Sequence, residues 1–290
     1  MTDAALPEPI LAPTQAPTQA NGGAYEVIYR HTRVVRITHW INVICILLLL
    51  MSGLQIFNAH PRLYWGQTGN EGDHSFLSML AYPTGEDTFR GETRLGDLRF
   101  NTTGVFGASL HDNRGMPWWA TLPGERNLAT GRRWHFFMAW IFVINGLVYL
   151  VSNAINGHFR RDLALSRREV APRNLWRDIV DHVLLKHPTG EAAKRYNPLQ
   201  KIAYLAIVFL VLPLIVLTGM TMSPGLDAFA PFLLTLFGGR QSARSIHFIC
   251  ANLIVLFVIV HVVEVFIAGV VNEIGSMITG RYRVKLGDHG

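Results

Sequence analysis

The chain has 290 residues, half of which are hydrophobic, and its mean hydropathy is positive. This composition is too apolar for an ordinary soluble domain of this length and is typical of a membrane protein. The formal net charge is +6, but no basic stretch is interleaved with base-stacking aromatic residues, so we expect no nucleic-acid binding. The two cysteines, Cys45 and Cys250, lie far from any Cys-x-x-Cys motif, which excludes a c-type haem attachment and an iron–sulfur cluster held by this chain.

The N-terminal segment is rich in Pro, Ala, Gln and Thr, and it lacks the basic start and apolar core of a secretory signal. Residues 1–24 are predicted to form a disordered tail. The remainder, 25–290, is predicted to form one membrane domain.

Four later segments are each apolar over roughly 20 residues, the length at which an α-helix crosses a bilayer. The predicted spans are 37–57, 134–155, 202–222 and 246–270. Basic residues gather before the first span, between the second and third, and after the fourth. They are Arg30, Arg33 and Arg36, nine Lys and Arg within 160–195, and Arg281, Arg283 and Lys285. This positive-inside pattern predicts a multi-pass membrane protein with both termini in the cytoplasm.

The connection between the first two spans, 58–133, is long, faces the outside and carries eight basic and eight acidic residues. Its length and its many Gly, Pro and Trp residues predict a folded cap with short helices, one of them near 75–81. The basic inner connection is predicted to contain a short amphipathic helix around 175–185. The expected fold class is therefore all-α: an integral membrane four-helix bundle with a long extracytoplasmic cap between its first two helices.

Two histidines of the fourth span, His247 and His261, are fourteen positions apart. Because an α-helix turns about 100° and rises about 1.5 Å per residue, they share one helix face and lie roughly 21 Å apart along its axis. His39 opens the first span on the inner side, and His135 opens the second on the outer side. The antiparallel spans place His39 level with His261, and His135 level with His247. A polar ring in hydrocarbon needs a partner, so the sequence predicts two stacked histidine pairs.

Two imidazoles at one depth on facing helices can hold a flat iron porphyrin, because bis-histidine ligation fills both axial positions of the iron. The expected metal ligands are therefore His39, His135, His247 and His261. Two haems stacked in this way would carry electrons across the membrane. Zinc is the competing metal, but a histidine pair without a nearby Cys or carboxylate makes a poor tetrahedral site.

Residues near these histidines are candidates for contact with the haems. Arg36, Arg132 and Arg133 are placed to meet haem propionates, and membrane topology or lipid headgroups explain them equally well. Gly53 follows the first-span histidine by fourteen residues, so it would let a macrocycle edge approach the backbone. Small-residue packing between helices is the alternative interpretation of this glycine.

Four short motifs connect the chain to a known family: "RITHW" and "GRRWH" open the first two spans, "RYNPLQK" precedes the third, and "IH" in the fourth has a second His fourteen residues later. Over about 29–57 and 132–281 the chain resembles the dihaem cytochrome b subunits of formate dehydrogenase, nickel–iron hydrogenase and thiosulfate reductase. The resemblance implies that the four histidines ligate two b-type haems. It also implies electron transfer between the quinone pool and a partner oxidoreductase outside the membrane.

Two finer expectations follow from this resemblance. The Tyr-Asn-x-x-Gln-Lys element of the family lies beside its quinone site, which marks Tyr196, Asn197, Gln200 and Lys201. The Asn-Pro step within it also fits a helix N-cap followed by Pro. The formate dehydrogenase type has a much shorter outer connection, so the long one here looks most like the thiosulfate-reductase-type branch, which implies a periplasmic molybdenum-containing partner.

Glu264 follows the last span histidine by one turn, and two roles fit it: a proton relay to a quinone, or an interfacial partner of a basic residue. No residue has the pattern of a nucleophile or general base for substrate chemistry, so we expect no catalytic residue. A stand-alone oxidoreductase that oxidises a species such as superoxide and reduces quinone is a second hypothesis. A haem-free transporter or assembly factor is a third, and it predicts no chromophore.

Overall fold

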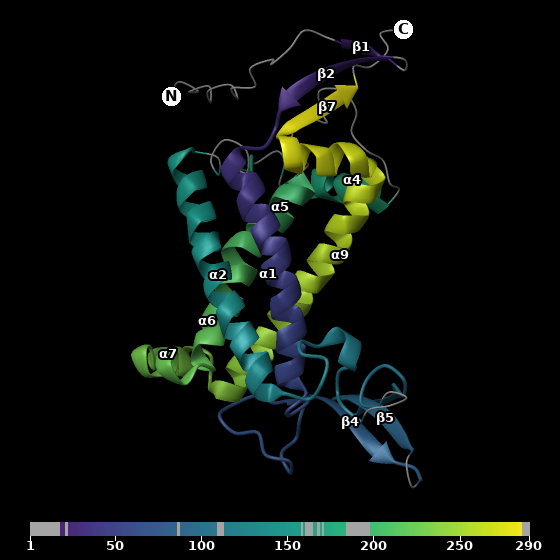
Figure 1. The fold of residues 1–290 in the computed structure, drawn as a ribbon, viewed down its shortest axis with the longest axis vertical. Coiled ribbons are helices and arrows are strands. Elements are labelled where there is room, and N and C mark those ends of the chain that lie inside the picture. Colours follow the sequence, from purple (N-terminus) through teal and green to yellow (C-terminus); the bar gives the residue numbers. More distant parts are fainter. Residues whose placement is uncertain are drawn as a thin grey trace. The chain divides into compact units, whose positions relative to one another are not determined.

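The protein is described here by a computed structural model, which covers residues 18–20, 23–85, 88–108, 113–157, 159, 165–166, 169, 171–183 and 198–285. Within this part, four helices are long and apolar enough to cross a membrane (Figure 1). They are α1 (Arg33–Phe57), α2 (Leu128–Ile155), the composite helix Pro198–Thr221, and α9 (Arg240–Thr279). The four spans predicted from hydropathy are therefore confirmed as helices.

The composite third helix contains one irregular turn. It consists of α5 (Pro198–Ala206), the π-helical turn η3 (Ile207–Val211) and α6 (Leu212–Thr221). Pro213 lacks a backbone N–H and its ring clashes with the preceding turn, so a widened turn ahead of it keeps the helix continuous. Two short helices follow, α7 (Pro224–Phe229) and α8 (Phe232–Leu236).

The chain divides into two compact units, and α1, α2 and α9 contribute to both. We call residues 41–145 and 210–255 the cap unit, and residues 1–40, 146–209 and 256–290 the terminal unit.

The cap unit contains a four-stranded antiparallel sheet in the order β3-β4-β5-β6. Its strands are β3 (Arg62–Leu63), β4 (Leu77–Pro83), β5 (Phe89–Leu95) and β6 (Leu98–Asn101), and the short 3-10 helix η1 (Trp118–Ala120) follows. One face of the sheet packs on the end of α1 through a core of Phe57, Leu63, Met79 and Met116. The prediction of a helix near 75–81 is therefore wrong, because those residues mostly form β4.

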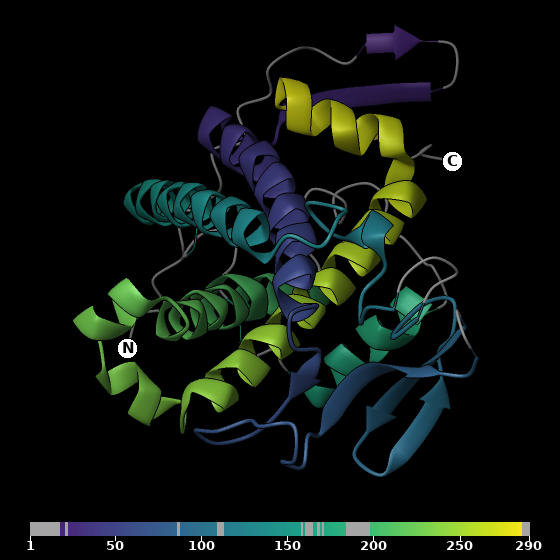
Figure 2. The ribbon, with the colours of Figure 1, turned by 60° about the horizontal axis from the view of Figure 1, so that its bottom comes forward.

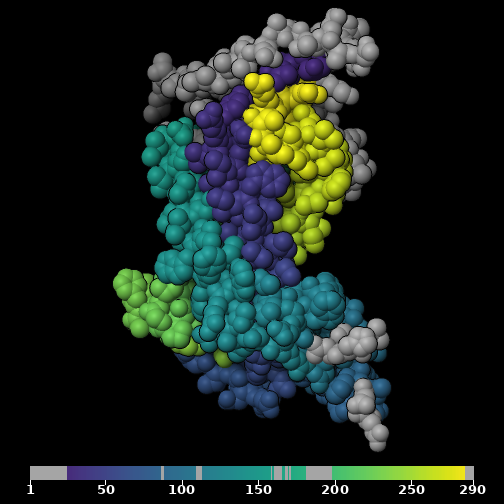
Figure 3. Space-filling view, in the orientation of Figure 1, coloured from purple at the N-terminus to yellow at the C-terminus, as the bar shows by residue number. Residues whose placement is uncertain are grey.

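Hydrogen bonds hold the cap, residues 58–133, against the helices of the same unit at the end of α1 and near the start of α9. The Asn58 side chain donates to the Met116 carbonyl at 3.1 Å and accepts from the Met116 N–H at 2.6 Å. On α9, the Ser245 hydroxyl donates to the Tyr64 carbonyl at 2.6 Å. The cap side chains consequently form a continuous mass with the adjoining helix ends (Figure 3).

The terminal unit contains a three-stranded antiparallel sheet in the order β1-β2-β7, built from both ends of the chain. Its strands are β1 (Thr18–Ala20), β2 (Gly23–Tyr29) and β7 (Arg281–Lys285). The amphipathic helix predicted around 175–185 is confirmed over the described residues as α4 (Pro172–Val183), and its location on the inner side stays a prediction. The predicted tail over 1–24 stays a prediction, because 1–17 and 21–22 lie outside the described residues.

Helix α9 bends at Gly269, whose φ of 108° is a left-handed conformation that only glycine adopts readily. After the bend, the last turns of α9 lie beside β2 (Figure 2), and β7 lies next to them in Figure 1. Glu273 pairs with Arg30 at 3.7 Å, and the Asn272 side chain donates to and accepts from the Arg283 backbone at 2.9 and 3.0 Å. The helix is thus longer than the predicted span 246–270, because its final turns pack on the terminal sheet.

The all-α expectation is too narrow, since the described residues include two sheets. Both sheets lie outside the four apolar helices. The helical expectation therefore holds for the hydrophobic segments and for α4, and it fails where the two sheets form.

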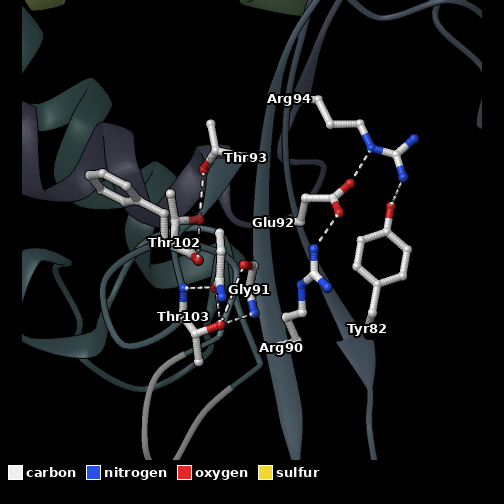
Figure 4. A network of polar contacts seen from close by, with 10 residues as sticks. Tyr82, Arg90, Gly91, Glu92, Thr93, Arg94, Thr102 and Thr103 are labelled. Carbon is white, nitrogen blue, oxygen red and sulfur yellow. Dashed lines mark hydrogen bonds and ion pairs between the residues drawn. The ribbon is translucent and has the colours of Figure 1, made fainter. Parts of the chain in front are cut away.

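An ion-pair network stabilises the two central strands of the cap sheet, β4 and β5 (Figure 4). Glu92, of which only 6% is exposed, accepts hydrogen bonds from Arg94 Nε at 2.5 Å and from Arg90 at 3.3 Å. Arg94 also donates to the Tyr82 hydroxyl at 2.7 Å. The hydrogen bond from Arg94 holds the pKa of the Glu92 carboxyl below its ordinary value.

We expect Glu92→Gln to destabilise the cap by about 1 kcal/mol, since it loses charge-assisted hydrogen bonds to two arginines that solvent partly screens. A lowered pKa means that the ionised carboxylate contributes stability above its ordinary pKa and loses it as pH falls through the lowered value. The difference in melting temperature between variant and wild type should therefore be present at neutral pH and shrink in acid. Asp97→Asn, at an exposed position on the β5–β6 turn, is the control and should leave the melting temperature unchanged.

Candidate functional site

Two of the four span histidines face each other in the cap unit. His135 on α2 and His247 on α9 have ring centroids 6.2 Å apart and ring planes inclined by 61°. His135 lies seven residues after the start of α2, and His247 lies seven residues after the start of α9. Each ring therefore comes from the second turn of its helix.

The other two histidines face each other in the terminal unit. His39 on α1 and His261 on α9 have ring centroids 6.3 Å apart and planes inclined by 63°. Phe257 stacks on His261 at 5.9 Å with an interplanar angle of 8°, and Trp40 meets His39 edge-on at 5.4 Å. The structure thus brings together both predicted pairs with the predicted partners.

The spacing within each pair fits two axial ligands of one iron. An imidazole nitrogen binds a first-row transition metal at about 2 Å, so two imidazoles on opposite sides of one ion hold their centroids about 6 Å apart. A direct imidazole–imidazole hydrogen bond needs a shorter spacing. Among the described residues, no group of three or more His, Cys, Asp or Glu lies together, so the histidines occur as pairs and not as parts of a larger cluster.

The hydrogen bonds of the cap-unit pair determine which ring nitrogen is available. His135 Nδ1 lies 3.2 Å from the Leu49 carbonyl, and His247 Nδ1 lies 2.9 Å from the Ile215 carbonyl. A carbonyl oxygen only accepts hydrogen bonds, so each Nδ1 must carry the proton and donate. In a neutral ring, Nε2 then keeps its lone pair and is the nitrogen that can bind a metal.

Two glycines lie against these rings. A Cβ at Gly53 would lie 3.3 Å from His135 Cε1, and a Cβ at Gly219 would lie 3.3 Å from His247 Cε1. That distance is tighter than ordinary van der Waals contact, so any larger side chain would push the imidazole away. Gly53 thus contacts the His135 imidazole directly, and the expected approach of a macrocycle edge to its backbone stays a prediction.

The terminal-unit pair has a different surrounding. His39 Nδ1 is buried and has no hydrogen-bond partner. A buried polar nitrogen of this kind costs free energy unless the ring gains another interaction. A metal ion bound at Nδ1 would supply that interaction, whereas a metal ion bound at Nε2 would leave the Nδ1–H without an acceptor.

The predicted arginines have other contacts in the structure. Arg36 donates to the Ile278 carbonyl near the end of α9, while its Nε is buried without a partner. Arg132 lies 5.8 Å from the Phe136 ring centroid, and Arg133 is exposed. Propionate contact by Arg36 or Arg133 therefore stays a prediction.

The predicted quinone residues are only partly described. Tyr196 and Asn197 lie outside the described residues. Gln200 and Lys201 begin α5, and Lys201 Nζ pairs with Glu169 at 2.8 Å. Burial pushes the pKa of Glu169 up, but hydrogen bonds from Lys201 and Ser166 outweigh it and hold that pKa below its ordinary value. Glu264 is half-buried in the same unit as His261.

Sequence reasoning missed three residues at the cap-unit pair: Ser52, Thr218 and Gly219. The Ser52 hydroxyl lies 3.1 Å from His135 Nδ1, and the Thr218 hydroxyl lies 3.2 Å from His247 Nδ1. The sequence feature that could have identified them is a Ser or Thr followed directly by Gly, which occurs at Ser52-Gly53 and at Thr218-Gly219 in two of the apolar spans. Each doublet is too short to stand out until its partner histidine is known.

Facing histidine pairs at axial spacing, carried by three of the four apolar helices, are typical of a membrane cytochrome of the b type. A family model described as prokaryotic cytochrome b561 matches residues 30–280. The chain is also 27% identical over 241 residues to a protein of Azospira oryzae that is named, provisionally, as the protein-methionine-sulfoxide reductase subunit YedZ1. That alignment covers 83% of this chain and 91% of the relative. No solved structure gives a significant match.

The chain belongs to the prokaryotic cytochrome b561 family. It is therefore a membrane-embedded haem protein of electron transport, and the family implies that the haem is of the b type. The paired histidines are the residues of this chain that fit such a group.

We expect Gly219→Leu to lower the haem bound per chain by one, because a Leu side chain would displace the His247 ring. Pyridine haemochrome content per purified protein measures this loss. Gly146→Leu is the matched control, since a Cβ at this α2 glycine would meet nothing within 4 Å. Equal haem content in the two variants would contradict the close contact between Gly219 and His247.

Proposed function

We propose that the protein is a dihaem cytochrome b that transfers electrons between the quinone pool and an oxidoreductase partner outside the cytoplasm. The observation that carries the proposal is the pair of ring separations, 6.2 and 6.3 Å, in two separate histidine pairs. Each separation has room for one iron between two imidazoles. The proposed ligands are His135 with His247 for one haem, and His39 with His261 for the other.

The histidine pairs limit the chemistry to electron transfer. A haem iron with two imidazole ligands has no open position for dioxygen and acts as a one-electron carrier. The protein contributes by holding both rings of a pair on rigid helices, which keeps the ligand set the same in both oxidation states. Helix α9 supplies one ligand to each pair, so a single element connects the two proposed sites.

The charge pattern supports an orientation with both termini in the cytoplasm of a bacterium. Basic residues lie directly after β2 (Arg30) and within α4 and β7, which flank the inner ends of the spans under this orientation. The cap between α1 and α2 then faces the periplasm. The cap sheet, with its exposed Phe89, Leu98 and Phe100, provides the docking surface that a partner needs.

The partner is proposed to be a periplasmic oxidoreductase that contains molybdenum. Two observations support it: the resemblance of the long outer connection to the thiosulfate-reductase-type branch, and the name of the Azospira relative, which makes that protein a reductase subunit. If this chain is likewise a subunit, the substrate is converted on the partner protein and not on this chain. The sequence agrees with this arrangement, since no residue in it has the pattern of a nucleophile or general base.

The quinone end is proposed to lie in the terminal unit, near the start of α5. Gln200 and Lys201 belong to the first turn of α5, and the Lys201 ammonium pairs with the carboxylate of Glu169. A quinone that changes its protonation needs polar and titratable groups next to an apolar wall. Glu264 is a second proposed proton carrier, since it lies on the helix that holds His261.

The second candidate function is a stand-alone oxidoreductase that takes electrons from a species such as superoxide and reduces quinone. The folded cap, which is far larger than a simple turn, favours the partner-linked function. Affinity purification of the tagged chain from its own membranes separates the two. A stoichiometric oxidoreductase in the eluate supports the subunit, whereas a monomer that reduces quinone with superoxide supports the alternative.

We expect His247→Ala to lose one of two haems per chain and the corresponding low-spin signal in the reduced-minus-oxidised spectrum. Haem content and spectra of the purified variant measure this. His74→Ala, which removes an exposed cap histidine, is the control and should bind two haems. A His247→Ala protein with unchanged haem content would contradict the proposed ligand pairs.

We expect Lys201→Met to slow haem reduction by added quinol about tenfold, the effect of a lost contact of roughly 1.4 kcal/mol, at unchanged haem content. Glu169→Gln separates direct contact from loss of the ion pair, because it leaves the ammonium in place. Arg177→Met, at an exposed basic position on α4, is the control. Stopped-flow rates equal to wild type in the Lys201 variant would contradict a quinone site at this position.

A further inference from the structure

The cap-unit histidines are held by two copies of the same short motif. Residues 49–53 of α1 read "LLMSG", and residues 215–219 of α6 read "IVLTG". In each copy the first residue offers its carbonyl to an imidazole, the fourth offers a hydroxyl, and the fifth is the glycine under the ring. The α1 copy holds His135, and the α6 copy holds His247.

The direction of the hydrogen bonds is the same in both copies. The Ser52 hydroxyl donates to the Leu48 carbonyl at 2.6 Å, and the Thr218 hydroxyl donates to the Leu214 carbonyl at 2.7 Å. A hydroxyl has one proton, so its oxygen is left to accept from the imidazole. Each Nδ1–H is therefore shared between one hydroxyl and one carbonyl, which fixes both the rotation of the ring and the nitrogen that stays free.

Ordinary helix packing does not account for these hydroxyls. Ser or Thr that bonds the carbonyl one turn back is common in apolar helices and adds little stability. Thr221 and Ser276 are equally inaccessible to solvent and bond only to backbone carbonyls of their own helices. Ser52 and Thr218 differ because each also reaches the imidazole of a neighbouring helix. In the other pair, His39 Nδ1 has no such acceptor.

We propose that Ser52 and Thr218 are matched positioning residues, which orient His135 and His247 and increase their basicity as ligands of one haem. This inference rests on the proposed dihaem function. A ligand imidazole that donates its other N–H to an acceptor binds the metal as a stronger base, which favours the oxidised iron. Removal of either hydroxyl should therefore raise the midpoint potential of the haem in the cap unit and leave the other potential unchanged.

The test compares Ser52→Ala, Thr218→Val and the double variant with wild type. Redox titration gives the two midpoint potentials, and the electron paramagnetic resonance g values of the oxidised protein report the orientation of the axial rings. Both single variants should shift the same potential upward and change the same low-spin signal, and the double variant should shift it further. Thr221→Val, one turn along α6, is the control and should change neither quantity.

The conservative variants Ser52→Thr and Thr218→Ser keep the hydroxyl and should restore the wild-type values. They also keep the inference testable if the alanine or valine variant binds no haem. Wild-type potentials and g values in haem-loaded Ser52→Ala and Thr218→Val would overturn this inference alone. Shifts of different haems by the two variants would also overturn it, and a wild-type protein without two low-spin haems would overturn the proposed function as well.

Discussion

The structure depends on how a membrane helix satisfies a buried imidazole. Each ring has two nitrogens, and apolar surroundings provide a partner for neither. In the cap unit, backbone carbonyls and hydroxyls take one nitrogen of each ring, so the second nitrogen is left for a shared ligand. In the terminal unit, His39 has a buried nitrogen without a partner. The hydrogen bonds thus fix the ring orientation and the free nitrogen of both histidines in the cap unit, whereas they do not fix those of His39 in the terminal unit.

The remaining architecture keeps these rings in place. α9 carries a ring in each unit, and its two ends are fixed by different means. Near its start, Ser245 bonds the cap backbone, while beyond the bend at Gly269 the helix is held by Asn272 and Glu273 against the terminal strands. The sheets outside the apolar spans therefore anchor the ends of α9 and limit the sliding or rotation that would separate a histidine pair. The Glu92 network strengthens the cap sheet in the same way.

The apolar part of the fold could be predicted from the sequence, and the polar part could not. A run of apolar residues admits only a helix in a bilayer, so hydropathy located all four spans, and the fourteen-residue spacing gave the histidine pairs. The cap was misjudged because its strands are joined by successive hairpins whose sequence signals are weak. One such signal is Gly96-Asp97, a two-residue turn between β5 and β6 in which Gly96 has a φ of 57°. Ser52 and Thr218 escaped notice because a hydroxyl in a membrane helix has many ordinary explanations.

The most direct test of the central claim is the ratio of haem to protein in the purified wild-type chain, measured with its oxidised and reduced spectra. Two facing histidine pairs predict two b-type haems per chain, both low-spin and both without a site for carbon monoxide after reduction. One haem per chain, or a high-spin haem that binds carbon monoxide, would contradict the claim that both pairs are axial ligand sets.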